Sequence, residues 1–316
     1  MYVRITMRRN ISEESQLAEY YFRDTPFIIG TILASEPINS RFYDGVTRIS
    51  VPEIAELISK WHDIFMSLTG QQGLSKAEQI SVAEESEYIM PIFAERSFGF
   101  VCSTLEMKQI VNKVKMYLYS MDQLKQTMPE DFFEKLKKAL MEFVCKMEAA
   151  PFRSALPVPD EKARDISLLA WRSRLDEWGE TYCTTYPASF RLLDSSVRDN
   201  LARFEFSFIR ENSEFPIKFH IPDIIRSSKF ADAWCEDLGD LVKKGYFPQA
   251  ILFDVCERGT LDGFVRQYKI STRPDGYKLN NEKYDQAINT WSRYSNRTLL
   301  EARTKEEVSD ELSNLL

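Results

Sequence analysis

The chain has 316 residues, of which 44% are hydrophobic and 13% aromatic, and its formal net charge at pH 7 is −7. A chain of this size and composition can fill one or two hydrophobic cores, which excludes a disordered protein. The negative charge argues against non-specific adhesion to DNA or to anionic lipid.

The pattern of apolar and polar residues over 1–51 predicts a small sheet with one helix. Apolar and polar residues alternate over Tyr2–Met7, which indicates a strand. We expect a short helix over Ser12–Phe22, a mostly apolar strand over Phe27–Ala34 and a further strand over Val46–Val51. The opening segment lacks the unbroken apolar stretch of a signal peptide, and nothing in the chain approaches the ~20 apolar residues that cross a bilayer. We therefore expect a cytoplasmic protein without membrane insertion.

Helices are expected where Ser or Thr is followed three residues later by Glu, because such a pair can satisfy two backbone N–H groups at a helix start. Five such pairs occur: Ser50–Glu53, Ser75–Glu78, Ser103–Glu106, Thr127–Glu130 and Thr304–Glu307. Three of the first four precede apolar residues at helical spacing. The sequence therefore predicts a helical block from about residue 51 to residue 150.

Residues 151–160 contain three prolines and no periodicity, which makes them the best candidate for a linker. The expected division is a mostly helical domain with a small sheet at 1–150 and a mixed α/β domain at 161–316. Four strands are expected in the second domain, at about 203–210, 215–221, 249–256 and 263–270.

The first two of these strands should form a hairpin, and the third should be a buried central strand. A helix that carries Trp234 should end at Gly245, because glycine accepts the left-handed conformation that stops helices. The expected fold class is α/β, or α+β: a small N-terminal sheet plus a helical block, then a C-terminal mixed sheet flanked by helices. No tandem repeat is apparent in the sequence.

Standard catalytic and cofactor-binding motifs are missing from the sequence. The five cysteines are odd in number and include no Cys-x-x-Cys pair, which favours a reducing compartment over a disulfide framework. His62 and His220 are the two histidines, and both are interpreted as structural or surface residues because zinc sites draw on several ligands at short spacing. The 11 glycines form no dinucleotide-binding or phosphate-binding loop. The sequence therefore predicts no cofactor.

One group of polar residues in the C-terminal half suggests chemistry. Asp254 lies near the end of the expected buried strand, and Gln267 and Lys269 lie two residues apart on the next strand, so their side chains share a sheet face. This order of helix, strand, acid, hairpin and Gln-x-Lys resembles the core of the PD-(D/E)xK nuclease superfamily. The resemblance implies that Asp254 holds Mg²⁺ and that Lys269 stabilises the attacked phosphate or positions the water.

The chain departs from that family pattern at two positions. Gln267 replaces the usual glutamate, and Phe253 replaces the proline that precedes the first acid. A hairpin with a polar outer face would show the same residues without any catalytic role, so the two interpretations stay open.

Two hypotheses for function follow. The leading one, reached by elimination, is an intracellular protein that binds another protein as a regulatory, accessory or inhibitor-type component, without a classical active site. Acidic helices that could steer a basic partner agree with it. The alternative is a nucleic-acid-binding protein with a divergent Mg²⁺-dependent nuclease core at Asp254, Gln267 and Lys269. Basic residues interleaved with tyrosines over about 266–297 agree with that alternative.

Overall fold

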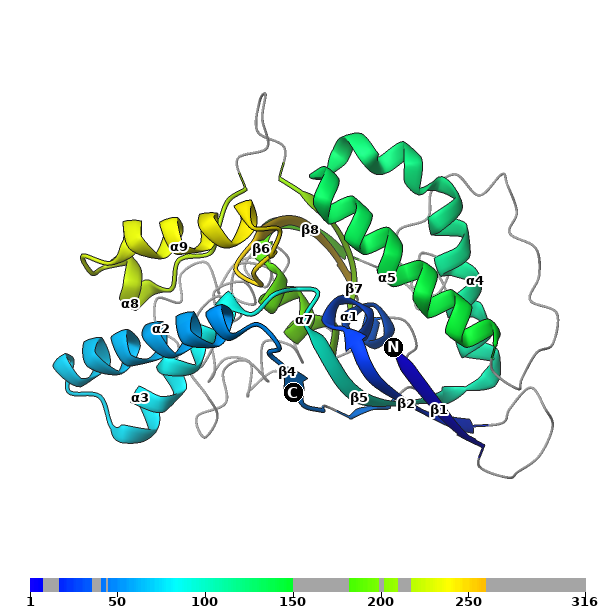
Figure 1. Cartoon of the computed structure of the whole chain (residues 1–316), viewed down its shortest axis with the longest axis horizontal. Coiled ribbons are helices and arrows are strands. Elements are labelled where there is room, and N and C mark those ends of the chain that lie inside the picture. Colours follow the sequence, from blue (N-terminus) through cyan, green and yellow to red (C-terminus); the bar gives the residue numbers. More distant parts are fainter. Residues whose placement is uncertain are drawn as a thin grey trace.

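The computed structural model of the chain contains two antiparallel sheets and helices that pack against them (Figure 1). The mixed α/β class expected from the sequence is thus confirmed. The structure describes residues 1–7, 17–35, 41–43, 45–149, 182–198, 202–209 and 217–259.

The first sheet has five strands in the order β1-β2-β5-β3, with β4 also paired to β5. Its strands are β1 (Tyr2–Met7), β2 (Leu17–Pro26), β3 (Arg41–Tyr43), β4 (Thr47–Arg48) and β5 (Glu95–Ser103). Every pairing is antiparallel. On β2 the buried residues Ala18, Tyr20 and Phe22 alternate with residues that face solvent, so one face of the sheet covers a core.

Two expectations for the N-terminal region are wrong. Within the segment expected as a helix over Ser12–Phe22, the described residues from 17 onward belong to strand β2. Phe27–Ser35, expected to be a strand, is helix α1, and all nine of its residues are buried. A helix buried on every side shows no apolar stripe, so its sequence is easily mistaken for a buried strand.

Between the first sheet and residue 149 the chain is mostly helical, as expected. The helices are α2 (Pro52–Gln71), α3 (Lys76–Ala83), the 3-10 helix η2 (Glu84–Ile89), α4 (Thr104–Ser120), the 3-10 helix η3 (Met121–Thr127) and α5 (Glu130–Glu148). The helical block expected from about residue 51 to residue 150 also contains a strand that was not expected, because β5 runs through it as the central strand of the first sheet. The alternating buried residues Phe98, Phe100 and Cys102 account for this strand.

The capping box at Ser103 is confirmed in full. The Ser103 hydroxyl accepts from the Glu106 backbone N–H at 3.1 Å, and the Glu106 carboxylate accepts from the Ser103 N–H at 2.9 Å. The cap residue of α2 is Val51 and that of α5 is Pro129, so Ser50 and Thr127 are not the caps of these helices. The box expected at Thr304 lies outside the described residues.

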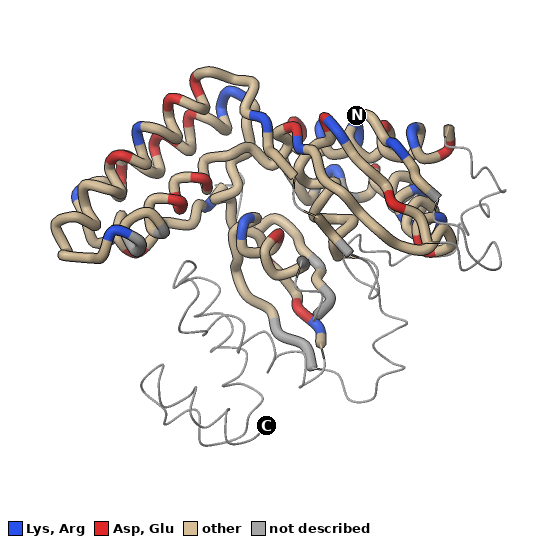
Figure 2. The backbone as a smooth tube through the Cα atoms, turned by 90° about the horizontal axis from the view of Figure 1, so that it is seen from below, with Lys and Arg blue, Asp and Glu red and all other residues tan. Residues whose placement is uncertain are grey.

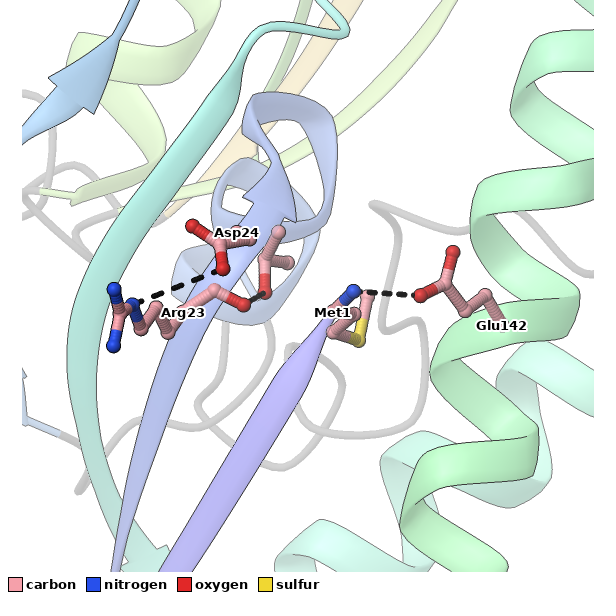
Figure 3. Close-up of polar contacts among 5 residues, drawn as sticks. Met1, Arg23, Asp24 and Glu142 are labelled. Atoms are coloured by element: carbon pink, nitrogen blue, oxygen red, sulfur yellow. Dashed lines mark hydrogen bonds and ion pairs between the residues drawn. The ribbon is translucent and has the colours of Figure 1, made fainter.

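A β-bulge interrupts β2 between Phe22 and Thr25. Asp24 in the bulge has a positive φ of 51°, and its carboxylate lies 3.7 Å from the Arg23 guanidinium (Figure 3). At the start of the neighbouring strand β1, the amino group of Met1 lies 2.7 Å from the Glu142 carboxylate of α5. This ion pair joins the first sheet to the helix that packs beside it.

The second sheet has three described strands in the order β6-β8-β7. Its strands are β6 (Tyr182–Ser189), β7 (Ala202–Phe208) and β8 (Leu252–Gly259), and helix α7 (Phe190–Arg198) packs against them. The chain between β7 and β8 also forms helices α8 (Asp223–Arg226) and α9 (Ala231–Lys243). The prediction of a central strand near residues 249–256 is confirmed by β8. The predicted hairpin is wrong, because β7 pairs with β8 and the described part of 215–221 contributes only a bridge from Phe219 to Ile251. The strand expected at 263–270 lies outside the described residues.

The stop expected at the end of α9 is confirmed. Gly245 has a φ of 78°, and its N–H donates to the Val242 carbonyl at 2.8 Å. The Tyr246 N–H donates to the Leu241 carbonyl at 2.8 Å. These two bonds are the Schellman motif, which satisfies carbonyls that a helix end leaves without partners.

Two hydrophobic cores hold the described elements together. The larger one lies between the two sheets and helices α1, α4, α5 and α7, and it includes Phe98 and Phe253. The smaller one joins α2, α3, η2, α8 and α9 around Trp61 and Trp234, whose rings meet edge to face at 4.8 Å. Residues from both sides of the expected linker at 151–160 contribute to each core. The linker itself lies outside the described residues, so the division into two domains stays a prediction.

Candidate functional site

The structure places one of the three residues expected to act in catalysis. Asp254 lies on β8, where its Cα pairs with Pro187 on one side and Ser207 on the other, and its side chain is half-buried. Gln267 and Lys269 lie outside the described residues, so the nuclease-like set stays a prediction. In the part of the chain that the structure describes, no group of three His, Cys, Asp or Glu residues is arranged to hold a metal ion.

The two histidines make separate contacts. His62 is half-buried on α2, with its Nδ1 atom 3.9 Å from the Asp63 carboxylate. His220 is also half-buried, and its ring stacks on Tyr88 at 4.8 Å. Both positions agree with the structural or surface roles expected from the sequence.

Two groups of buried polar side chains are packed into the larger core. The Thr31 hydroxyl donates to the Asp194 carboxylate at 2.5 Å, and the Arg96 guanidinium lies 4.0 Å from the same carboxylate. The Tyr186 hydroxyl donates to the Glu257 carboxylate at 2.8 Å. All five residues are buried, so each group is enclosed by the core instead of opening onto a substrate cavity. We interpret both groups as structural.

A groove of about 390 Å³ runs between α2 and α9. The Lys60 ammonium lies 2.6 Å from the Asp237 carboxylate, which also accepts from the Trp61 indole N–H at 2.8 Å. Lys244 forms an ion pair with Glu53 across the same groove. Because these charges pair with one another, we interpret the groove as a contact between two helices, with little charge left to bind a ligand.

The helices around this groove form an acidic lobe. We use the name helical lobe for α2, α3, η2, α8 and α9. Its segments, residues 51–89 and 217–247, contain twelve acidic and seven basic residues. Figure 2 shows acidic and basic positions interleaved along these helices. The lobe therefore carries most of the net negative charge of the chain, spread as a solvated surface.

The outer face of the first sheet carries a different set of side chains. Val3 and Ile5 of β1 pack on the core, so Tyr2 and Arg4 point outward. On β2, Tyr21 and Arg23 are exposed in the same way, and Tyr43 is exposed on β3. The exposed fractions are 56% for Tyr2, 40% for Tyr21 and 49% for Tyr43.

The strand register brings Arg4, Tyr21 and Tyr43 into one row across four strands, and Tyr2 and Arg23 pair with each other beside it. Tyr21 pairs with Arg4 on one side and with Gly99 on the other, and Gly99 pairs with Tyr43. The Arg4 guanidinium lies 5.8 Å from the centre of the Tyr21 ring. A Cβ at Gly99 would lie 3.4 Å from the Tyr43 Cβ, so a side chain at this position would contact Tyr43 over β5. We use the name tyrosine face for Tyr2, Arg4, Tyr21, Arg23, Tyr43 and Gly99.

Helices lie on the opposite side of this sheet. α1, α4 and α5 contact the first sheet and contribute to the larger core with its buried residues (Figure 1). The strands that carry the tyrosine face are therefore fixed from behind by a packed core. Such a backing makes the face a preorganised surface, because its backbone is already ordered before anything binds.

Reasoning from the sequence missed the tyrosine face. A helix over Ser12–Phe22 would not have placed Tyr21 on a sheet face, and strand β5, which carries Gly99, was not expected. The signal that could have found it is the period-two alternation of Tyr2 with Arg4 and of Tyr21 with Arg23.

Comparisons with known protein families, with curated proteins and with solved structures found no match for this chain. No helix in the described part of the chain is long and apolar enough to span a membrane.

Proposed function

We propose that the protein binds another protein through the tyrosine face and acts as a regulatory, accessory or inhibitor-type component. The observation that carries this proposal is the row of exposed tyrosines beside Arg4 and Arg23 on the outer face of the first sheet. Tyrosine and arginine are enriched in protein interfaces and among the residues that contribute most to binding. A single exposed aromatic residue would need no explanation, but three on one sheet face form a patch.

The charges on the face indicate the chemistry of the partner. Arg4 and Arg23 offer guanidinium groups that can bind carboxylates through two hydrogen bonds, and the tyrosine hydroxyls can accept or donate. The nearby Asp24 carboxylate already contacts Arg23, which leaves Arg4 beside Tyr21 as the stronger site for an acidic group. The proposed partner therefore presents acidic side chains next to apolar surface.

Aromatic and basic side chains on a sheet can also stack and hold single-stranded RNA. The net charge of −7 and the acidic helical lobe favour a protein, because nucleic-acid affinity depends on neutralising phosphates. RNA is therefore an outcome that the experiment must be able to detect.

The proposal is tested by photo-crosslinking in the native cell. A photoreactive phenylalanine is placed at Tyr21 in one variant, at Tyr43 in a second and at Tyr119 in a third. Tyr119 is the matched control, because it is 68% exposed but lies on α4, away from the face. We expect the first two variants to form an adduct with the same protein, identified by mass spectrometry, and the third to lack it. An adduct that ribonuclease removes, or adducts that do not differ from those at Tyr119, would contradict the proposal.

The identified partner then allows a quantitative test with purified proteins. Replacing Tyr21 or Tyr43 by alanine is expected to weaken binding about 30-fold each, since interface residues of this kind contribute about 2 kcal/mol or more. Tyr119→Ala should leave the affinity unchanged. The free energy of unfolding should change by less than about 0.5 kcal/mol in all three variants, because the side chains are exposed.

A further inference from the structure

A similar series of elements occurs twice in the described chain. Residues 17–103 contain strand β2, helix α1, strands β3 and β4, helices α2 and α3, the 3-10 helix η2 and, at the end, strand β5. Residues 182–259 contain strand β6, helix α7, strand β7, helices α8 and α9 and, at the end, strand β8. The strand orders correspond, β2-β5-β3 in one sheet and β6-β8-β7 in the other. In both segments a nine-residue helix follows directly after the first strand.

Backbone hydrogen bonds place these elements in register. In each segment the first two N–H groups of the nine-residue helix donate to two carbonyls that lie two residues apart, just before the last strand. The four bonds are Phe27 to Ala94 at 2.8 Å, Ile28 to Ile92 at 3.1 Å, Phe190 to Ile251 at 3.0 Å and Arg191 to Gln249 at 3.2 Å. This correspondence matches Phe27 with Phe190 and Ala94 with Ile251.

A short stretch of sequence agrees with the match. Residues 48–54 read Arg-Ile-Ser-Val-Pro-Glu-Ile, and residues 218–224 read Lys-Phe-His-Ile-Pro-Asp-Ile. The two stretches agree in residue type at every position: base, apolar, polar, β-branched, proline, acid and isoleucine. Each lies beside the last strand of its segment and leads into a helix, since Arg48 pairs with Glu95 and the Lys218 carbonyl accepts from the Leu252 N–H.

Matched residues also meet one another between the two segments. Pro91 forms a bridge with Pro248, flanked by two reciprocal bonds, from the Ile92 N–H to the Phe247 carbonyl at 2.7 Å and from the Gln249 N–H to the Met90 carbonyl at 2.8 Å. The Phe27 and Phe190 rings lie 6.2 Å apart, and Thr31 donates to Asp194. Contacts in which a position meets its own counterpart are typical of an interface with two-fold symmetry.

We infer that residues 17–103 and 182–259 are two copies of one structural unit, packed about a pseudo-two-fold axis like the protomers of a homodimer. The axis passes between α1 and α7 and between Pro91 and Pro248. This repeat is not apparent from the sequence alone. Similarity at the level of sequence persists over about seven residues, which is too short to recognise before the elements are aligned.

Two matched positions near the axis differ in polarity. Arg96 corresponds to Phe253, and each packs against the matched phenylalanine of its copy: Arg96 lies 4.4 Å from the Phe27 ring and Phe253 lies 6.2 Å from the Phe190 ring. Thr31 corresponds to Asp194. The buried Arg96–Asp194 pair therefore joins the two copies. The counterpart of Arg96 is a phenylalanine, and the counterpart of Asp194 is a threonine.

The inference also bears on the proposed function, and this part rests on that proposal. The counterparts of Tyr21, Gly99 and Tyr43 are Thr185, Cys256 and Glu205, by their places in the two sheet registers. The second copy therefore has no tyrosines at the matched positions. One partner per chain is expected.

The repeat is tested by exchanging residues between matched positions of the full chain. The variant Arg96→Phe with Asp194→Thr copies each residue from its counterpart. The variant Arg96→Thr with Asp194→Phe has the same composition but places each residue at the wrong position. Thermal unfolding of both is compared with that of the wild type, and the test needs no binding partner, so it can fail independently of the proposed function.

We expect the matched variant to unfold cooperatively within about 5 °C of the wild type, since a buried ion pair can often be replaced by well-packed apolar residues. The mismatched variant should unfold at least about 10 °C lower, because phenylalanine has no space at residue 194 and threonine leaves a cavity at residue 96. Equal effects of the two variants, in either direction, or a lower unfolding temperature for the matched one, would overturn the inference.

Discussion

The two sheets share a three-strand order, β2-β5-β3 in the first and β6-β8-β7 in the second, but differ on both of their faces. On the core side of the central strands, Phe98 and Phe100 of β5 correspond to Val255 and Glu257 of β8. The outer face of the first sheet carries exposed tyrosines, which the second lacks at the matched positions. One backbone arrangement thus supports a wholly apolar central pair in one sheet and a buried carboxylate in the other. The carboxylate is tolerated because Tyr186 donates to it.

Removing the central ring of the first sheet should have the largest effect. Phe98 is fully buried and stacks on Phe22 at 4.8 Å and on Phe42 at 5.0 Å. Phe98→Ala is expected to lower the free energy of unfolding by about 3–5 kcal/mol. Val255→Ala, at the matched position, should lower it by about 2 kcal/mol, because it removes only two methyl groups. Denaturant titration measures both, and equal losses would show that the two sheets do not differ as described.

The buried carboxylate of the second sheet gives the next largest effect. Tyr186→Phe removes the hydroxyl that donates to Glu257 and should lower the free energy of unfolding by about 1.5–3 kcal/mol. Tyr43→Phe, which removes an exposed hydroxyl from the first sheet, is the control and should change it by less than about 0.5 kcal/mol. If the two substitutions cost the same, the Tyr186–Glu257 bond contributes nothing to stability.

A smaller loss of unfolding free energy is expected at the end of β5. Ser103 links this strand to α4 through a complete capping box, so Ser103→Ala should cost about 1 kcal/mol of unfolding free energy. Ser50 begins a Ser/Thr-x-x-Glu pair that forms no box at α2, where Val51 is the cap residue, and Ser50→Ala should cost less than about 0.5 kcal/mol. A larger loss at Ser50 would contradict the capping geometry.

The reactivity of the cysteine thiols offers a comparison of the two sheets that does not rely on unfolding energies. Cys102 lies on the core face of β5, where burial and the nearby Glu106 carboxylate raise the pKa of its thiol, so that it stays protonated and unreactive. Cys256 is half-buried on the outer side of β8, and Cys145 is exposed on α5. We expect iodoacetamide at about pH 8 to modify Cys145 first, then Cys256, and Cys102 only after unfolding. Peptide mass spectrometry gives the order, and early modification of Cys102 would be inconsistent with its burial.

Local signals predicted the fold well where one physical cause decided the structure. The alternation in Tyr2–Met7 gave β1, the apolar stripe after Ser50 gave α2, and Gly245 ended α9. In each case the deciding interaction lies within a few residues of the chain, so the sequence contains it directly.

Features that depend on distant contacts could not be predicted in this way. Phe27–Ser35 is helical because it is surrounded by the core on every side, and its apolar sequence fits a strand equally well. β7 pairs with β8, more than forty residues later, although the nearer segment at 215–221 also alternates. The tyrosine face requires the register of four strands, which no single segment of the sequence contains.

The contact between Thr31 and Asp194 has a consequence for how the two copies can diverge. In an association of identical chains, one mutation alters both sides of the axis, so an aspartate there would face another aspartate, and two buried carboxylates so close together cannot both stay ionised. Joining both copies in one polypeptide removes that constraint, since either side changes alone. Arg96 and Asp194 can then be acquired on opposite sides, and covalent connection keeps them together at any dilution.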